Sequence, residues 1–374
     1  MFNSLRLKIA RERRGLTKKA LAEITGITTR TLSTYENSGL LDATDDVVVE
    51  KIATALRYPI EFFNADNPEL VVKEGVSFRA MTKLSSAKRD AALSAGTLAL
   101  EFNQWLENKF NLRKPNLIDC SSDSYTDPES AAQLLREHWN IGELSISNMV
   151  HLLESHGVRV FSLSENCVEV DAFSFWLDEK PFVFLNTMKT AERSRFDAAH
   201  ELAHLVLHKH SSNNGRQAEE QADRFASAFL MPKGSVLAKV PAYPSLDQLL
   251  KLKKYWKVSL AALIRRTYDL ELSSEWHYRQ LSIELSKVYG RKLEPEGMKI
   301  METSLVLQKA FAKLRENNVS RNDVLFELKL PRDELSAISF NNPFFLFQSV
   351  SSDSTYKKSE PDGRISAPRL KAVN

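Results

Sequence analysis

Cysteine is almost absent from this chain of 374 residues: Cys120 and Cys167 stand far apart and show no paired spacing. Disulfide-stabilised secreted proteins and cysteine-ligated metal sites both need clustered cysteines. The sequence therefore argues against a disulfide framework and a cysteine metal site. We expect both thiols to be free and reduced.

Long apolar runs are also missing. No window approaches the ~18 uninterrupted apolar residues of a membrane helix. The first residues, Met1 to Arg6, lack a signal-peptide pattern, and the chain contains no internal repeat. We expect a soluble protein that stays in the cytoplasm and has no membrane partner.

Neither sign of charge dominates, since 51 basic and 48 acidic side chains leave a formal net charge of only +3. The first 40 residues are an exception, with five more basic than acidic side chains. A local excess of this kind favours nucleic-acid binding, although a basic bundle used for protein contact or dimerisation would look the same. The basic residues are Arg6, Lys8, Arg11, Arg13, Arg14, Lys18, Lys19 and Arg30.

With 43% hydrophobic residues, the chain can bury more than one core and should form two or three domains. The patterns predict a mainly α protein with a small antiparallel β-sheet, of the α+β class. We expect a helix-turn-helix domain at 1–67, a linker and connecting helix at 68–127, a metallopeptidase domain at 128–272, a helical C-terminal domain at 273–348 and a flexible tail at 349–374.

The N-terminal segment reads as helix, tight turn, helix. Thr17 can cap the first helix, Ala22 permits close helix crossing, and Gly26 suits a left-handed turn residue. The pattern resembles the XRE (repressor-like) helix-turn-helix family over about Leu5 to Phe63. This resemblance implies double-stranded DNA as a partner and permits a homodimer. The predicted DNA-contacting residues are Lys18, Lys19, Thr28, Thr29, Arg30, Ser33 and Thr34.

A second motif, His200-Glu201-Leu202-Ala203-His204, lies inside an apolar run with helical character. Histidines four positions apart share one helix face and can hold one zinc ion. Glu201, on the same turn, can act as general base. This combination is the chemistry of a zinc peptidase, although iron or manganese can bind the same ligand types.

A catalytic zinc site needs a third protein ligand, which should lie downstream. Glu219 and Asp223 are one turn apart on a second predicted helix, so a ligand and a carboxylate that orients a ligating histidine would face the same way. Asp223 fits the orienting role. Glu220 is a weaker ligand candidate, and His208 and His210 fit the helix end or site rim better.

The motif residues, with Phe225 to Pro232 downstream and Ala172 to Ser174 upstream, resemble the ImmA/IrrE family of zinc metallopeptidases. The resemblance covers about Val76 to Leu335. It implies that His200, His204 and Glu219 are the ligands and Glu201 the base. Ala203 departs from the glycine of many relatives, but both residues are small.

Three strand-like runs, 158–163, 168–177 and 182–185, precede the motif. We expect the strand from Phe182 to Asn186 to be the outer one and to hold an extended substrate by main-chain pairing. The residue that stabilises the oxyanion stays open, with His208, His210, Tyr243 and His277 as candidates.

The favoured function is an endopeptidase, attached to DNA by its own helix-turn-helix, that cleaves a transcriptional repressor or other regulatory protein. One alternative is a DNA-binding repressor or antitoxin-type regulator whose metal domain senses or binds a partner without turnover. Another is a regulator that cleaves itself, for which the loop from Leu112 to Asp127 is a natural cut site.

Overall fold

The computed structural model describes residues 2–37, 46–72, 76–78, 85–121, 127–163, 170–210, 215–290 and 294–346. Three features named from the sequence therefore lie outside the described residues: the predicted tail at 349–374, residues 122–126 of the loop from Leu112 to Asp127, and Cys167. None of the helices in the described part of the chain combines the length and apolar character needed to cross a membrane.

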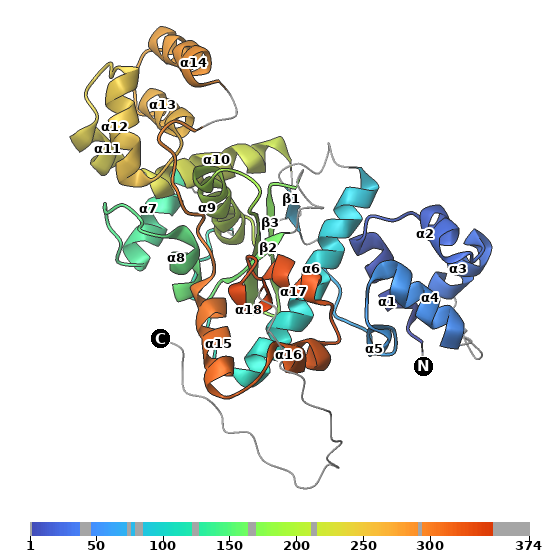
Figure 1. Cartoon of the computed structure of the whole chain (residues 1–374). Helices are drawn as coiled ribbons and strands as arrows, with labels where there is room; N and C mark the ends of the chain where they lie inside the picture. The colour runs from blue at the N-terminus through green and yellow to red at the C-terminus, as the bar shows by residue number, and fades with distance from the viewer. Residues whose placement is uncertain are drawn as a thin grey trace.

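Helices dominate, and one small sheet lies at the centre (Figure 1). The expected α+β class is confirmed. The N-terminal bundle comprises α1 (Ser4–Arg13), α2 (Lys18–Thr25), α3 (Thr29–Asn37), α4 (Asp46–Leu56) and α5 (Ile60–Phe63). The Thr17 hydroxyl accepts from the Ala20 N–H at the start of α2, and Gly26 ends α2 with φ 72°, both as the sequence predicts.

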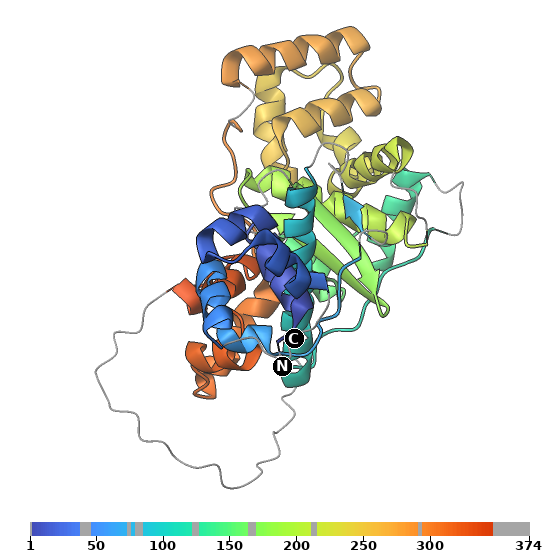
Figure 2. The ribbon, with the colours of Figure 1, turned by 90° about the vertical axis from the view of Figure 1, so that its right-hand side faces the viewer.

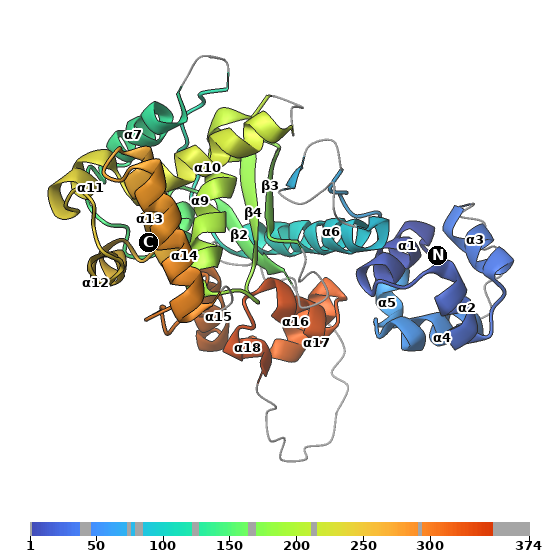
Figure 3. The same cartoon turned by 90° about the horizontal axis from the view of Figure 1, so that it is seen from above.

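The long helix α6 (Ser86–Lys109) connects this bundle to the rest of the molecule, with the bundle at its N-terminal end (Figure 3). Gly96 allows α6 to lie against the sheet, because a Cβ there would come within 3.1 Å of Val71 and 3.5 Å of Phe173. On the other side of the sheet lie α7 (Pro128–His138), α8 (Met149–Ser155), α9 (Ala191–Leu207) and α10 (Arg216–Leu230).

The sheet contains β1 (Ser77–Phe78), β2 (Arg159–Leu163), β3 (Ala172–Leu177) and β4 (Lys180–Asn186), in the order β1-β3-β4-β2. The β3–β4 hairpin is antiparallel, with Phe173 opposite Phe184. The β2–β4 pair is parallel, so the sheet is mixed rather than wholly antiparallel. β2 and β3 follow one another in the chain but are not neighbours in the sheet. β4 lies between them, antiparallel to β3 and parallel to β2.

The expectation that the strand from Phe182 to Asn186 is an outer strand is wrong. This strand is β4, and it pairs with β3 on one side and β2 on the other, so its backbone groups are already used. Among the described strands, β1 and β2 are the edges of the sheet. A run of apolar residues predicts burial but not which neighbours a strand has.

The two faces of the sheet belong to two hydrophobic cores. Phe161, Phe173, Phe175 and Phe184 face the core shared with α6 and the C-terminal helices. The alternate residues, such as Val160 and Val183, face α9 and α10. The same alternation directs Ser174 of β3 toward α9, where its hydroxyl reaches Glu201.

Four further helices follow the motif helices: α11 (Lys233–Lys239), α12 (Leu246–Trp256), α13 (Leu260–Asp269) and α14 (Glu275–Tyr289). Of these, α12 to α14 form a projection remote from the N-terminal bundle (Figure 2). The chain then returns as a strap, residues 294–304, which leads into the final helices.

Buried charges hold this strap against α9. Arg195 pairs with Glu302, and Glu192 accepts the Met298 N–H at 2.6 Å. The last helices, α15 (Leu305–Glu316), α16 (Arg321–Leu328), α17 (Arg332–Ile338) and α18 (Pro343–Leu346), then pack beside α6, α8 and β2. The first and last parts of the chain therefore share one core.

Candidate metal centre and helix-turn-helix

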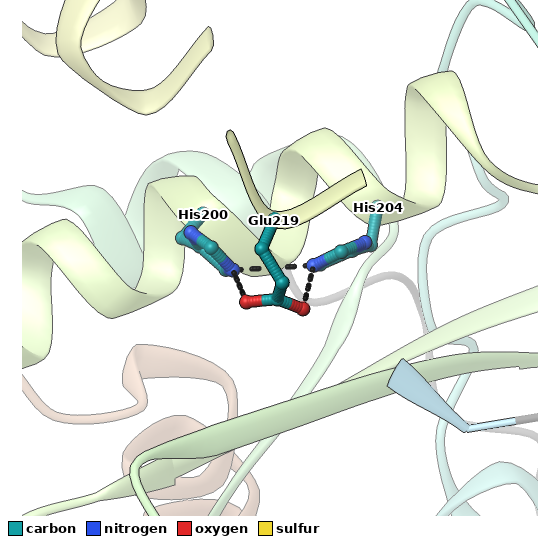
Figure 4. Close-up of side chains that lie close together, drawn as sticks. All are labelled: His200, His204 and Glu219. Atoms are coloured by element: carbon teal, nitrogen blue, oxygen red, sulfur yellow. Dashed lines mark hydrogen bonds and ion pairs between the residues drawn. The ribbon is translucent and has the colours of Figure 1, made fainter. Parts of the chain in front are cut away.

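Two helices bring three potential metal ligands together (Figure 4). His200 and His204 project from one face of α9, and Glu219 projects from the first turn of α10. The two histidine side chains are almost fully buried, whereas Glu219 keeps 24% of its side chain exposed. The cluster is thus enclosed on the α9 side and accessible near Glu219.

The distances within the cluster suit a small tetrahedral ion. His200 Nε2 lies 3.1 Å from His204 Nε2, and these two atoms lie 3.4 Å and 3.5 Å from the Glu219 oxygens. Ligands placed tetrahedrally at 2.0–2.1 Å from zinc are about 3.3 Å apart. The three side chains are therefore close enough together to share one metal ion.

The protonation of His204 and Glu219 also suits a metal. Burial lowers the pKa of His204 to about 4, so its imidazole is neutral at neutral pH. Burial opposes ionisation of Glu219, but the two imidazoles that face its carboxylate hold its pKa well below the usual range. Neutral imidazoles and a carboxylate are the forms that bind a divalent cation.

Each imidazole is held at its second nitrogen. His200 Nδ1 lies 2.9 Å from Asp223 Oδ1 on α10, in the arrangement that the sequence predicts. His204 Nδ1 lies 3.0 Å from His208 Nδ1, and His208 Nε2 lies 3.0 Å from Gln221 Oε1. No local pattern in the sequence indicates a role for Gln221, because its contact depends on how α10 packs against the end of α9.

Glu201 is completely buried beside the cluster. Its Oε2 accepts a 2.7 Å hydrogen bond from the Ser174 hydroxyl, while Oε1 has no hydrogen-bond partner among the described residues. Burial raises the pKa of Glu201 to about 7. The Ser174 hydroxyl therefore fixes Oε2 of Glu201, and Oε1 is able to accept a proton. Sequence reasoning gave Ser174 no role, although strand alternation directs it to this face.

The other candidates for a third ligand or for stabilising the oxyanion lie outside the three-residue cluster. Glu220 is exposed and pairs with Arg216, and His210 is exposed and pairs with Asp119 at 3.0 Å. Tyr243 and His277 pack edge to face on each other near the start of α14. Among the described residues, the structure groups only His200, His204 and Glu219 as a potential metal site.

The predicted DNA-contacting residues lie on α2, α3 and the turn between them. Lys19, Thr28, Thr29, Arg30 and Thr34 are exposed, whereas Ser33 is half-buried. The Thr28 hydroxyl accepts from the Thr31 N–H and so caps α3. Lys18 pairs with Glu36 at 3.3 Å, which reduces its availability to a phosphate.

The positive excess of the first 40 residues is mostly internal. Arg6 pairs with Glu101, Arg11 with Glu36, and Arg13 and Arg14 with Glu334. These arginines join α1 to the rest of the protein, so they do not form a surface for phosphates. The local charge count therefore overestimated the basic surface available to DNA.

Comparison with known protein families agrees with both motifs. A helix-turn-helix family model matches residues 7–63, and an IrrE N-terminal-like domain model of the M78 peptidases matches residues 153–268. The second match runs from α8 to α13 and includes the whole potential metal site. A search of curated proteins finds no match to this chain. The chain therefore joins an XRE-type, DNA-binding helix-turn-helix domain to an ImmA/IrrE-type metallopeptidase domain.

Proposed function

We propose that this protein is a zinc endopeptidase that cleaves a transcriptional repressor or another regulatory protein while its helix-turn-helix holds it on DNA. The observation that carries the proposal is the set of 3.1–3.5 Å separations among His200, His204 and Glu219, which matches tetrahedral zinc coordination. A DNA-bound regulator would work in the cytoplasm.

In this proposal His200, His204 and Glu219 hold the metal. Zinc supplies Lewis acidity, which makes water a stronger nucleophile and polarises a peptide carbonyl. Glu201 takes the proton of the attacking water at Oε1 and passes it to the leaving amine. The Ser174 hydroxyl keeps the Glu201 carboxylate in place, and Asp223 orients His200.

The burial of Glu201 favours catalysis over metal binding alone. A site that only retains a metal needs ligands, but it has no use for a carboxylate that is fully buried beside them with one oxygen unpartnered among the described residues. Burying such a group without a full set of partners costs stability. A role in proton transfer accounts for its presence.

The ligand set is tested by metal analysis of purified full-length protein. Wild type should contain close to one zinc per chain by plasma mass spectrometry, and His204→Ala and Glu219→Ala should each lose most of it. Glu220→Ala is the matched control, because Glu220 is the exposed neighbour outside the cluster, and its zinc content should not change. Wild type that takes up no metal, even after zinc is supplied, would rule out the peptidase.

Proteolysis is tested with a pool of quenched fluorescent peptides and with the full chain itself. Zinc-loaded wild type should cleave peptides, whereas Glu201→Gln should keep its zinc and lose activity by at least 1,000-fold, as expected for removal of a general base and its charge. Mass spectrometry of the incubated full chain detects a cut within residues 112–127. Zinc binding without any cleavage would favour a sensor that does not turn over.

A further inference from the structure

We propose that a cavity between α6, α8, β2 and α15, separate from the metal centre, binds a small uncharged molecule with a hydroxyl or N–H group on a hydrocarbon body. The cavity has a volume of about 120 Å³. A cavity of ~150 Å³ in a protein core holds a benzene molecule. The exposed residues Asn111 and Arg113 form part of the wall, so the cavity opens to the surface. The space therefore fits a body of about the size of one benzene ring, with its outer edge in the opening.

Asn103 of α6 is the polar side chain that indicates such a ligand. It lines the cavity and is only 4% exposed. Its amide N–H donates to Glu107, one turn further along α6 and outside the cavity wall, so Oδ1 is the group that Asn103 has left to offer. Among the described residues, no donor reaches this oxygen. A buried acceptor without a donor costs free energy, and a ligand that donates to Oδ1 removes this cost.

Several donors in the cavity wall are used elsewhere. The Arg159 guanidinium pairs with Glu107 at 3.1 Å. The Ser304 hydroxyl donates to Glu154, and the Ser155 hydroxyl donates to a carbonyl within α8 at 2.7 Å. These groups are therefore not available to Asn103, and a ligand in the cavity can supply the missing donor.

The rest of the inner wall is apolar. Its most buried members, each no more than 3% exposed, are Leu106 of α6, Val160 and Phe161 of β2, and Leu307 of α15. Such side chains form no hydrogen bonds with a ligand and favour hydrocarbon. Apart from its donor group, the ligand should therefore be apolar.

The charges of the wall disfavour an ionic ligand. A carboxylate has no proton to donate to Asn103 Oδ1. A cation would lie beside the guanidinium groups of Arg113 and Arg159. Among the described residues that line the cavity, Glu154 is the acidic one, and its carboxylate already accepts from the Ser304 hydroxyl and from two backbone N–H groups at the start of α15. The ligand that fits this wall is a neutral donor.

The position of the cavity gives the ligand access to three parts of the protein. The helix α6 leads to the DNA-binding bundle, β2 belongs to the sheet that supports Glu201, and α15 begins the C-terminal helices (Figure 1). A ligand that fills the cavity contacts all three at once and stabilises their packing. This site would accept a small-molecule signal whether or not the metal domain cleaves a substrate.

Isothermal titration calorimetry on the zinc-loaded full chain tests the proposal with phenol and toluene as probes. The two molecules have nearly the same shape, and toluene lacks the donor. Phenol should bind with a Kd on the order of 0.1–1 mM, the range expected for a ligand of this size. A purely apolar cavity would favour toluene, the more hydrophobic probe, whereas a donor to Asn103 Oδ1 should make phenol bind about fivefold more tightly or better. Toluene binding as tight as that of phenol, or no saturable phenol binding, would overturn the proposal.

Two variants locate the site. Asn103→Leu keeps the size of the side chain and removes the acceptor, so toluene should then bind at least as tightly as phenol. Asn108→Leu is the matched control, because Asn108 is exposed on the same helix and outside the cavity wall, and both probes should bind as they do to wild type. Leu305→Trp places a larger side chain in the cavity and should abolish binding of both probes.

If Asn103→Leu fails to fold, the preference of wild type for phenol and its loss in Leu305→Trp still decide. Phenol binding that is unchanged in the folded variants would show that phenol binds elsewhere, for example at the zinc ion, and would refute the assignment to this cavity.

Discussion

At the scale of single residues, the protonation of His204 is set by a relay of hydrogen bonds. A ligating His204 must carry its proton on Nδ1, so that Nε2 offers a lone pair to the metal. The Nδ1 proton then points to His208 Nδ1, 3.0 Å away, which must accept it. His208 in turn carries its own proton on Nε2 and donates it to Gln221 Oε1. Gln221 therefore determines which nitrogen of His204 is free.

This relay predicts the effect of changing His208. His208→Leu removes the acceptor and should weaken zinc binding 10- to 100-fold, the usual effect of losing a group that orients a metal ligand. His208→Asn keeps an acceptor near the Nδ1 position and should retain most of the affinity. Competition with a chelator measures both. Equal affinity of His208→Leu and wild type would contradict the relay.

A buried carboxyl far from the metal links stability to pH. Burial raises the pKa of Glu154 to about 7, although three hydrogen bonds oppose this shift. In the unfolded chain the group ionises near its ordinary value, so above that value the unfolded state has lost a proton that the folded state keeps. The stabilisation present at low pH is lost as pH rises toward about 7, and the loss amounts to about 3 kcal/mol.

Glu154→Gln tests this linkage. The variant cannot ionise, so its stability relative to wild type should rise between pH 5 and pH 8, by up to about 3 kcal/mol. Denaturant unfolding of both proteins at the two pH values gives the difference. A constant difference across this range would mean that Glu154 is ionised throughout.

At the scale of elements, the helices could be predicted because their signals are local. Thr17 and Gly26 delimit α2, as the sequence predicts. The neighbours of each strand, and contacts between residues distant in the sequence, were not predictable in this way. The central position of β4 and the contact of Gln221 with His208 depend on partners distant in sequence. The proximity of His200 and His204 could be predicted, because residues four positions apart in a helix lie on the same face.

The turn between α2 and α3 provides a test of one such local signal. Gly26 has φ 72°, a conformation in which a Cβ is strained, and no atom outside the turn lies within 4 Å of the Cβ position. Gly26→Ala should therefore cost about 1 kcal/mol through backbone strain alone. Gly26→Asn, which tolerates this conformation better, should cost less. Thermal unfolding measures both, and equal melting temperatures for the two variants would argue against strain.

At the scale of the whole molecule, one acidic residue joins the DNA-binding bundle to the C-terminal helices. Glu334 on α17 is 1% exposed. It forms ion pairs with Arg13 at 2.7 Å and Arg14 at 3.0 Å, and it accepts a hydrogen bond from the Tyr58 hydroxyl at 3.1 Å. Together with the Arg6–Glu101 pair, this contact fixes α1 against two distant parts of the chain. It also explains why the Arg13 side chain does not face solvent.

Removing Glu334 should disrupt this junction. Glu334→Ala removes the buried carboxylate that Arg13, Arg14 and the Tyr58 hydroxyl share, and loss of one member of a buried ion pair typically costs 3–5 kcal/mol. The neighbouring Asp333→Ala is the control, because its side chain is 56% exposed and its pair with Arg14 should contribute less than about 1 kcal/mol. Thermal unfolding and limited proteolysis between the bundle and α6 compare the two variants. Similar behaviour of both would mean that the junction does not depend on Glu334.

The return of the chain along the strap has a consequence for synthesis. The core that contains Phe102 of α6 also contains Phe311 and Phe345, which are synthesised after the peptidase domain. The part of α6 that packs against these phenylalanines is therefore not covered until the peptidase domain has been made. A nascent chain that stops before α15 would expose this surface and become a target for chaperones or aggregation. The order of residues thus leaves α6 incompletely packed until the metal-binding domain has been made.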